Sequence, residues 1–394
     1  MKQHKFAPWL IIMAGVVAAM HIGKLPPTIP ILQQQLDLNL NQVGFLLSAI
    51  QAAGMLCALS LGMAAGKIGL KKMLMGGLGI LMVASTLGAF SQHFYALFAA
   101  RLLEGFGFLC VILPAPALLR QLVSLDKLKA MMAYWGAYMG LGVALSLLIT
   151  PLGLQAFHWS YVWLGFAALA FVMGLWVWRV VPVVQVSHHQ QQSLGQLFRQ
   201  ILSHAPSWLL GLVFACYTSQ WFAIMGFLPS IYIQANVAAA HAGMLTALVC
   251  LSNVLGSVLS GVLLQQGRRA LSLLSTGFVV MIVGTIMMFA GVNDLPFIWQ
   301  YVGVLAFSMV GGLIPGVVFA YAGVLAPSPQ LVAGSIGWIQ QWSSLGQFCL
   351  PPLMGVLVTW WGGWEQAWMV CVTLSILGIL GSFKIQSLID KVRF

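Results

Sequence analysis

The stretch RLLEGFGFLCVILPAPALLR, residues 101–120, lies inside a long apolar segment yet carries two charged residues near its start. Arg101 and Glu104 are three residues apart, and charges at such depth usually face a cavity or a partner instead of lipid. A Gly-x-Gly pair follows, which allows another helix to approach closely. Two prolines, the first of them Pro114, then interrupt the backbone hydrogen bonds and bend the helix. The stretch therefore predicts a polar site and a hinge within one membrane span.

The composition of the whole chain supports a membrane setting. Of its 394 residues, 61% are hydrophobic and only 6% are charged, whereas ordinary soluble domains have about 25% charged residues. The apolar runs are continuous over roughly 20 residues, which is typical of spanning helices rather than barrel strands. The net charge of +11 comes from short basic clusters between these runs, so we do not expect nucleic-acid binding. The sequence predicts an all-α protein embedded in a lipid bilayer.

Twelve spanning helices are predicted along the chain. Their approximate ranges are 8–31, 42–65, 73–92, 94–121, 130–152, 160–180, 207–233, 242–264, 270–291, 296–324, 331–358 and 365–383. All but two of the 17 Lys and Arg residues then fall on one side of the membrane, which predicts that both termini are cytoplasmic. The polar segment 182–206 is the expected cytoplasmic linker between two six-helix bundles, residues 1–181 and 207–394.

The two predicted bundles show signs of an internal duplication. Residues 62–72 read GMAAGKIGLKK and residues 261–269 read GVLLQQGRR, each with glycines and paired basic residues in a tight turn. Pro114 in the fourth span has a counterpart in Pro315 of the tenth, so we expect a bend in both. Duplicated halves of this size are typical of secondary transporters.

The loop between the second and third spans resembles the Gly-x-x-x-Asp-Arg-x-Gly-Arg-Arg loop of the major facilitator superfamily. Gly62, Gly69, Lys71 and Lys72 match that pattern in kind, and Gly66 stands where the family has its Asp. The resemblance covers the whole chain and implies the fold of that family, two pseudo-symmetric bundles of six helices. It also implies that these four residues, together with the two bends, take part in gating. The missing Asp predicts that the cytoplasmic lock is weaker or made otherwise.

A finer resemblance is to the branch of that family containing cyanate permeases and nitroimidazole transporter-like proteins. It rests on GKLPPTIP at 23–30, LLEGFGF at 102–108, LPAPALLR at 113–120 and WGAYMGLG at 135–142. The resemblance implies a small-molecule substrate, the inner membrane of the cell and a monomer. The Gly-Pro pattern that drug-exporting members have in the fifth span is not found, which disfavours a proton-driven drug exporter.

Lys24 and Arg101 are the two basic residues that the topology leaves within spans. At 1.5 Å per residue, Lys24 lies roughly 24 Å along the first span and Arg101 roughly 10 Å into the fourth from the other side, so their depths are similar. In the family, both spans line the central cavity, and the two cations there would bind an anion. Two simpler interpretations remain open: Lys24 extends to the outer interface, or Arg101 bonds to backbone carbonyls or to Glu104.

Proton coupling has two candidate residues. Glu104 is the one acidic residue in the interior of a predicted span, and coupling needs a carboxyl group whose protonation depends on its surroundings. Against this role, Arg101 one turn earlier favours the ionised carboxylate. His21, one turn before Lys24, is the second candidate, with a hydrogen-bonded structural role as the alternative.

The second half has no charged residue in the interior of a predicted span, and it provides aromatic and amide side chains instead. Residues considered for substrate contact, with packing as the alternative, are Tyr138 in the first half and Tyr217, Gln220, Trp221 and Gln341 in the second. Charge in one half and neutral polar groups in the other fit a small monoanion. The predicted function is transport of a small organic or inorganic anion by alternating access, with proton coupling left open.

Two alternatives accompany this prediction. The first is an exporter of small toxic compounds, and the second is a membrane receptor that binds a ligand without moving it. The longest predicted loop is about 25 residues, which leaves little room for the output domain of a receptor. No nucleophile–base pair, metal-ligand spacing or phosphate-binding loop occurs in the sequence, so we expect neither an enzyme nor a cofactor or metal.

Overall fold

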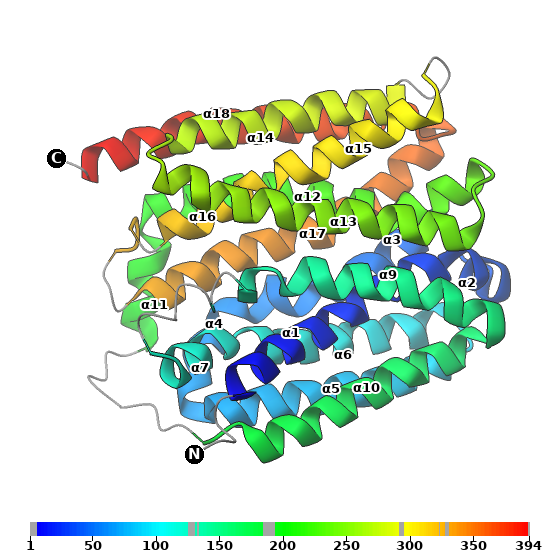
Figure 1. Cartoon of the computed structure of the whole chain (residues 1–394), viewed down its shortest axis with the longest axis horizontal. Coiled ribbons are helices and arrows are strands. Elements are labelled where there is room, and N and C mark those ends of the chain that lie inside the picture. The colour runs from blue at the N-terminus through cyan, green and yellow to red at the C-terminus, as the bar shows by residue number, and fades with distance from the viewer. Residues whose placement is uncertain are drawn as a thin grey trace. The chain divides into compact units, whose positions relative to one another are not determined.

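The computed structural model describes residues 6–124, 131, 134–183, 194–290, 295–322, 324–327 and 331–392. Within these ranges every regular element is helical (Figure 1). Among the described residues, eleven helical segments are long and apolar enough to cross a membrane by length and composition. A further helix, α17, has 30 residues and matches the predicted span at 331–358, although its amides, serines and tryptophans make it less apolar. The described segments therefore match the twelve predicted spans in number and order, with ends that differ by up to nine residues, as at the end of α18 (Trp368–Val392).

The chain forms two compact units. The first contains residues 1–191 together with 225–247, and the second contains residues 192–224 and 248–394. The helices of the first unit are α1 (Ala7–Gly23), α2 (Ile29–Leu36), α3 (Leu40–Ala49), α4 (Ala52–Ile68), α5 (Leu70–Ala89), α6 (Phe94–Ile112), α7 (Ala115–Leu122), α9 (Tyr138–Ala156) and α10 (Trp159–Val180).

The second unit begins with the short helix α11 (Leu194–Leu202), and it shares α12 (Ala205–Gln234) and α13 (Ala239–Gln265) with the first unit. Its remaining helices are α14 (Ala270–Thr285), a π-helical turn (Ile286–Ala290), α15 (Phe297–Gly311), α16 (Leu313–Ala322), α17 (Val332–Trp361) and α18 (Trp368–Val392).

In the first unit, α5 packs between α6 and α10 (Figure 1). Glycines bring the backbones of α5 and α6 together: a Cβ atom added to Gly77 would lie 2.7 Å from the carbonyl oxygen of Gly107. Between membrane helices, such close approach replaces the hydrophobic driving force with van der Waals packing. The Gly-x-Gly pair of the fourth span therefore serves a helix contact, as its sequence predicts.

The first two spans are interrupted, although the sequence pattern predicts continuous helices for both. In the first, α1 ends at Gly23, and a 3-10 turn (Pro26–Thr28) precedes α2. Pro26 and Pro27 have no N–H group, so the helical hydrogen bonds cannot continue through them. The Thr28 hydroxyl donates a 2.7 Å hydrogen bond to the Lys24 carbonyl at this break. In the sequence, the two adjacent prolines are the feature that indicates this break.

The second span breaks between α3 and α4, at residues 50–51. Here α6 comes so close that a Cβ atom on Gly105 would lie 2.3 Å from the Ile50 carbonyl oxygen. No proline marks this position in the sequence, because the break accompanies a contact with a distant helix.

Features of the predicted duplication recur in each unit. Gly69 (φ 94°) joins α4 to α5 and Gly267 (φ 82°) lies between α13 and α14, both in a conformation that favours glycine. The fourth span divides into α6 and α7 at Pro114, and the tenth divides into α15 and α16 close to Pro315. Both predicted bends are therefore present.

The contact at the second break predicts a large effect of one methyl group. Gly105→Ala would force Cβ into the Ile50 carbonyl, and we expect a loss of about 1–3 kcal/mol of stability, as for other overpacked interiors. Thermal unfolding of the purified protein in detergent measures it. Gly76→Ala, at a glycine of α5 whose added methyl would meet no other part of the described structure within 4 Å, is the matched control and should not lower the melting temperature. Equal melting curves for the two variants would contradict the proposed packing.

Candidate functional site

Four titratable side chains from two helices meet in the interior of the first unit. His21 lies at the end of α1, and Lys24 follows one turn later on the same face. Arg101 and Glu104 lie one turn apart in α6. All four have 0% exposed surface. We call these four residues the charge cluster.

Glu104 joins the two cations of the cluster. Its Oε1 accepts a 2.5 Å hydrogen bond from Lys24 Nζ, and its Oε2 accepts one of 2.5 Å from Arg101 Nη1. The ring nitrogen Nδ1 of His21 lies 3.3 Å from the same Oε1 and 3.4 Å from Lys24 Nζ. Each carboxylate oxygen is thus paired with a different cation, which holds Glu104 in its ionised form.

Arg101 also connects α6 to the backbone of two other helices. Its Nη1 donates a 2.7 Å hydrogen bond to the His21 carbonyl, and its Nε donates one of 3.4 Å to the Leu46 carbonyl in α3. Cations are stabilised at the carboxyl-terminal end of a helix, where carbonyl groups lack partners. Arg101 therefore makes both kinds of structural hydrogen bond that the sequence analysis gave as alternatives, to backbone carbonyls and to Glu104.

Lys24 does not extend to the outer interface, so that alternative is wrong. Its ammonium group donates a 2.6 Å hydrogen bond to the Ser85 hydroxyl of α5 and lies 4.0 Å from the ring centroid of Trp163 in α10. Ser85 in turn donates a 2.9 Å hydrogen bond to the Trp163 carbonyl. A buried indole face attracts a cation, which adds to the stabilisation of Lys24.

Sequence reasoning did not find Ser85 or Trp163. A single serine in an apolar helix carries little information, because it commonly bonds to its own backbone. Trp163 lies in the apolar sixth span, and its proximity to Lys24 depends on the packing of α1 against α10. Both residues are fully buried beside the charge cluster.

Two ring nitrogens beside Lys24 have no hydrogen-bond partner among the described residues. They are Nε2 of His21 and Nε1 of Trp163, and both belong to side chains with 0% exposed surface. Burying a polar group without a partner costs about 1–3 kcal/mol. Such atoms indicate a place where a ligand or water completes the hydrogen bonding.

In the second unit, neutral side chains form a separate polar group. Asn253 of α13 donates 2.7 Å hydrogen bonds to the Tyr217 hydroxyl and to the Ser308 carbonyl. The indole N–H of Trp221 donates a 3.0 Å hydrogen bond to the Ser308 hydroxyl. Gln220, which the sequence placed beside Tyr217 and Trp221, lies apart from them: its amide bonds to the Cys216 carbonyl and to Ser375 of α18.

The remaining predicted residues lie outside the charge cluster. Tyr138 stacks on Trp135, with ring centroids 4.4 Å apart, and both rings pack against Gly15. Gly15 precedes Lys24 by nine residues, about 13 Å along the helix, so Tyr138 cannot share a small ligand with the ammonium group. Gln341 is half-buried on α17.

The predicted gating residues occupy the short turn between α4 and α5 and its surroundings. Gly69 is the turn residue itself, and Gly62 lies two turns earlier in α4 near the Leu113 side chain. Lys71 Nζ donates a 2.8 Å hydrogen bond to the Trp178 carbonyl at the end of α10, whereas Lys72 is exposed.

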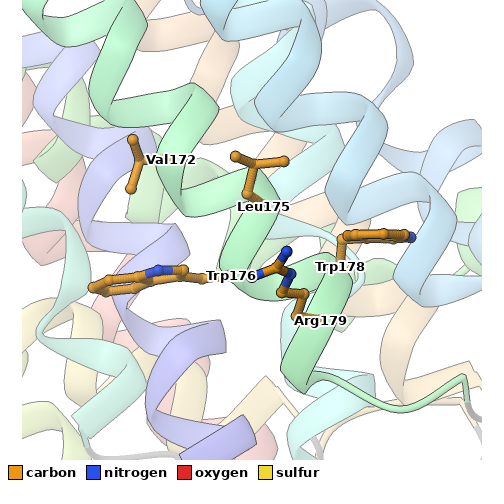
Figure 2. A pocket seen from close by; sticks show the side chains of 5 residues that line it. All are labelled: Val172, Leu175, Trp176, Trp178 and Arg179. Atoms are coloured by element: carbon orange, nitrogen blue, oxygen red, sulfur yellow. The ribbon is translucent and has the colours of Figure 1, made fainter.

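A shallow pocket at the end of α10 does not involve the charge cluster. It is lined by Val172, Leu175, Trp176, Trp178 and Arg179, all from this one helix (Figure 2). The two tryptophans point to different sides of the helix and are 55% and 56% exposed. Exposed tryptophans and arginine at the end of an apolar helix are typical of the membrane interface. We interpret this pocket as a lipid-facing surface.

A membrane protein of paired helical units with interrupted helices beside buried charges has the form of a secondary transporter. The family model described as Major Facilitator Superfamily matches residues 11–344. The chain belongs to the major facilitator superfamily, and it is a transporter, not an enzyme.

Two curated relatives come from Escherichia coli strain K12. The chain is 26% identical over 243 residues to the cyanate transport protein CynX, covering 60% of this chain and 61% of that protein. It is also 26% identical over 270 residues to the 2-nitroimidazole transporter, covering 66% of each. The predicted resemblance to this branch is confirmed, over somewhat less than two thirds of each relative's length.

A third relative is the D-xylose transporter of Levilactobacillus brevis, 26% identical over 158 residues, or 40% of this chain and 34% of that one. Among solved structures, a bacterial homologue of the human lysosomal transporter Spinster superposes with a TM-score of 0.77 in its unoccupied inward-facing form and 0.80 in its occupied one. Both matches cover 100% of this chain and at least 98% of the other at 13% identity, which confirms the predicted fold.

The position of Glu104 between two buried cations predicts its importance for stability. Glu104→Gln would leave both cations without their counter-charge, and we expect a loss of roughly 3–5 kcal/mol, as for other broken buried ion pairs. Thermal unfolding in detergent measures this loss. In the double variant Lys24→Met/Glu104→Gln one of the unpaired cations is removed, so it should be more stable than Glu104→Gln alone. If the stability change in the double variant equalled the sum of the changes in Glu104→Gln and in Lys24→Met, the two residues would not interact.

Proposed function

We propose that this protein moves a small monoanion across the membrane by alternating access, with the charge cluster as its binding centre. The main support is the charge of that cluster. Lys24 and Arg101 bring two positive charges and Glu104 one negative charge, all at 0% exposure. With a neutral His21 and a protonated Lys24, one positive charge remains, and an uncompensated buried charge is costly. A monoanion offsets that charge completely.

The bonding of Arg101 supports the same proposal. Its hydrogen bonds to Glu104, His21 and Leu46 use Nη1 and Nε, and within the described part of the chain none uses Nη2. A guanidinium group binds planar oxygen pairs through two nitrogens side by side. We propose that Nη2 is the nitrogen that an entering anion contacts first.

The substrates named for the relatives fit this chemistry. Cyanate, named for one relative, carries a single negative charge. The nitro group of 2-nitroimidazole, named for the other, presents two oxygen acceptors in a plane, as a carboxylate does. We propose that this protein accepts a small ligand that carries one negative charge or two coplanar oxygen acceptors.

A second candidate function is export of small toxic compounds. The observation that favours it is the similarity to a protein named as a 2-nitroimidazole transporter, since this heterocycle has an uncharged form. Such a substrate would use the neutral polar group around Asn253 and Tyr217 in place of the charge cluster. Substitutions in the charge cluster would disable the first function, whereas substitutions in the neutral polar group would disable the second.

Binding and movement are linked, in this proposal, by the broken helices. The break at residues 24–28 contains Lys24 itself, and the break at residues 50–51 touches Gly105, next to Glu104. Interrupted helices beside a binding site are the places where transporters bend. An anion that pairs with Lys24 and Arg101 would change the bonds that hold both breaks, as the bundles 1–181 and 207–394 rock.

The proposal includes the membrane setting and the coupling ion. We place the protein in the inner membrane as a monomer with both termini cytoplasmic, on the basis of its Lys and Arg distribution and its family resemblance. We also propose that transport is coupled to protons through the charge cluster, of which His21 and Glu104 are members. Coupling requires a group whose charge differs between the loaded and empty site.

The experiment is a binding screen on the purified full-length protein, followed by uptake into liposomes. Cyanate, nitrate and formate should raise the melting temperature, whereas D-xylose should not, because the site requires a negative charge. Arg101→Lys keeps the charge but loses the planar fork, and we expect about tenfold weaker binding, equivalent to about 1.4 kcal/mol.

Arg179→Lys is the matched control for that substitution, since it changes an exposed arginine outside the cluster. It should bind and transport as the unmodified protein does. If no monoanion shifts the melting temperature, or if Arg101→Lys transports formate normally, anion binding by the cluster is refuted. Stabilisation by 2-nitroimidazole alone, lost in Asn253→Ala, would instead favour export.

A further inference from the structure

We propose that Lys24 carries the coupling proton, and that one proton enters the site with each monoanion. This inference rests on the proposed function, since it takes the charge cluster as the anion site. It differs from the expectation drawn from the sequence, which named Glu104 and His21 as the coupling residues. The coupling residue is the member of the cluster that can change its charge at the lowest cost.

Charge balance singles out Lys24. Arg101 keeps its proton in proteins under all ordinary conditions. Glu104 has a cation on each oxygen, so its protonation would leave two buried positive charges facing a neutral acid. Loss of the Lys24 proton has the opposite result, because it leaves one Arg101–Glu104 ion pair with no net charge. Buried lysines change their protonation readily for this reason.

The surroundings of Lys24 accommodate both of its charge states. Its ammonium is faced by His21 from α1, by Arg101 and Glu104 from α6, by Ser85 from α5 and by the rings of Trp163 and Phe166 from α10. No other titratable group contacts it in the described ranges. A neutral amine still donates to Glu104 and Ser85, so the geometry persists without the charge.

His21 provides the route for this proton. Its Nδ1 lies 3.4 Å from Lys24 Nζ, and its Nε2 has no partner among the described residues. In the release step, Lys24 Nζ gives its proton to Nδ1 and keeps the electron pair, while the imidazole gives the proton on Nε2 to a water molecule, the acceptor that this proposal requires. The ring thereby changes tautomer, and the cluster loses one unit of positive charge. Entry of a proton at Nε2 reverses each step.

The consequence is an electroneutral cycle. The empty site is neutral with an uncharged Lys24, and the loaded site is neutral with a charged Lys24 and a bound anion. Neither state buries a net charge, which keeps both accessible during transport. Glu104 in this scheme is a positioning residue: it holds Lys24 and Arg101 in place and stays ionised throughout.

The test measures protons taken up when cyanate binds the purified full-length protein. Calorimetric titrations in buffers of different ionisation enthalpy give this number between pH 6 and 10, with nitrate as a second probe. We expect uptake to approach one proton per anion toward alkaline pH, with affinity falling up to tenfold per pH unit there. Lys24→Arg keeps the positive charge but cannot release its proton. It should therefore bind cyanate without proton uptake and with an affinity independent of pH.

The outcomes separate the two proposals. If cyanate and nitrate do not bind the unmodified protein, the proposed function fails and this inference fails with it. If they bind without proton uptake at any pH in that range, or if Lys24→Arg still takes up a proton, only the assignment to Lys24 is overturned. The measurement on the unmodified protein keeps the test decisive even if Lys24→Arg does not fold. His21→Asn is expected to retain the proton count and to slow proton-driven cyanate uptake into liposomes by about tenfold or more.

Discussion

The ion pairing of Glu104 is the interaction on which the first unit depends. One carboxylate binds Lys24 at the end of α1 and Arg101 in its own helix, and through them it reaches α3, α5 and α10. Each of these groups is fully buried, so none can be compensated by water. The cost of leaving any one of them unpaired is what holds these helices in register around the site.

The same requirement explains why the first span is broken where it is. A continuous helix through residues 24–28 would use the carbonyls at the end of α1 for its own hydrogen bonds. Pro26 and Pro27 remove the N–H groups that would bond to the Ile22 and Gly23 carbonyls. At the same break the His21 carbonyl accepts from Arg101, and the Lys24 carbonyl accepts from the Thr28 hydroxyl. The carbonyl-rich end of α1 then lies beside two cations, where its partial negative charge is favourable. Interruption of the helix and stabilisation of buried charge are therefore parts of one arrangement.

The two units share a scaffold but differ in their interior chemistry. Both have a positive-φ glycine turn and a divided fourth helix, as expected after duplication. The first has ions in its interior, whereas the second has the neutral group of Asn253, Tyr217, Trp221 and Ser308. Relatives that are named for cyanate, 2-nitroimidazole and D-xylose show that this family handles ligands of different charge. Interior side chains on a constant scaffold are a physical basis for such variation.

The sequence by itself determined the membrane class, the approximate spans, the duplication and the identity of the buried charges. These properties follow from local composition and periodicity, because the bilayer imposes the same length and polarity on every helix. It also indicated His21, Lys24, Arg101 and Glu104 as candidates, since charge within an apolar span is conspicuous.

Only the tertiary structure decided how these residues are connected. That Glu104 lies between Lys24 and Arg101, that Ser85 and Trp163 complete their surroundings, and that the second span breaks at residues 50–51 all depend on contacts between helices distant in sequence. A pattern along one helix specifies which residues are polar and on which face they lie. The distance between two such faces is set by packing, where glycines such as Gly105 let backbones meet and bring the charges within bonding range.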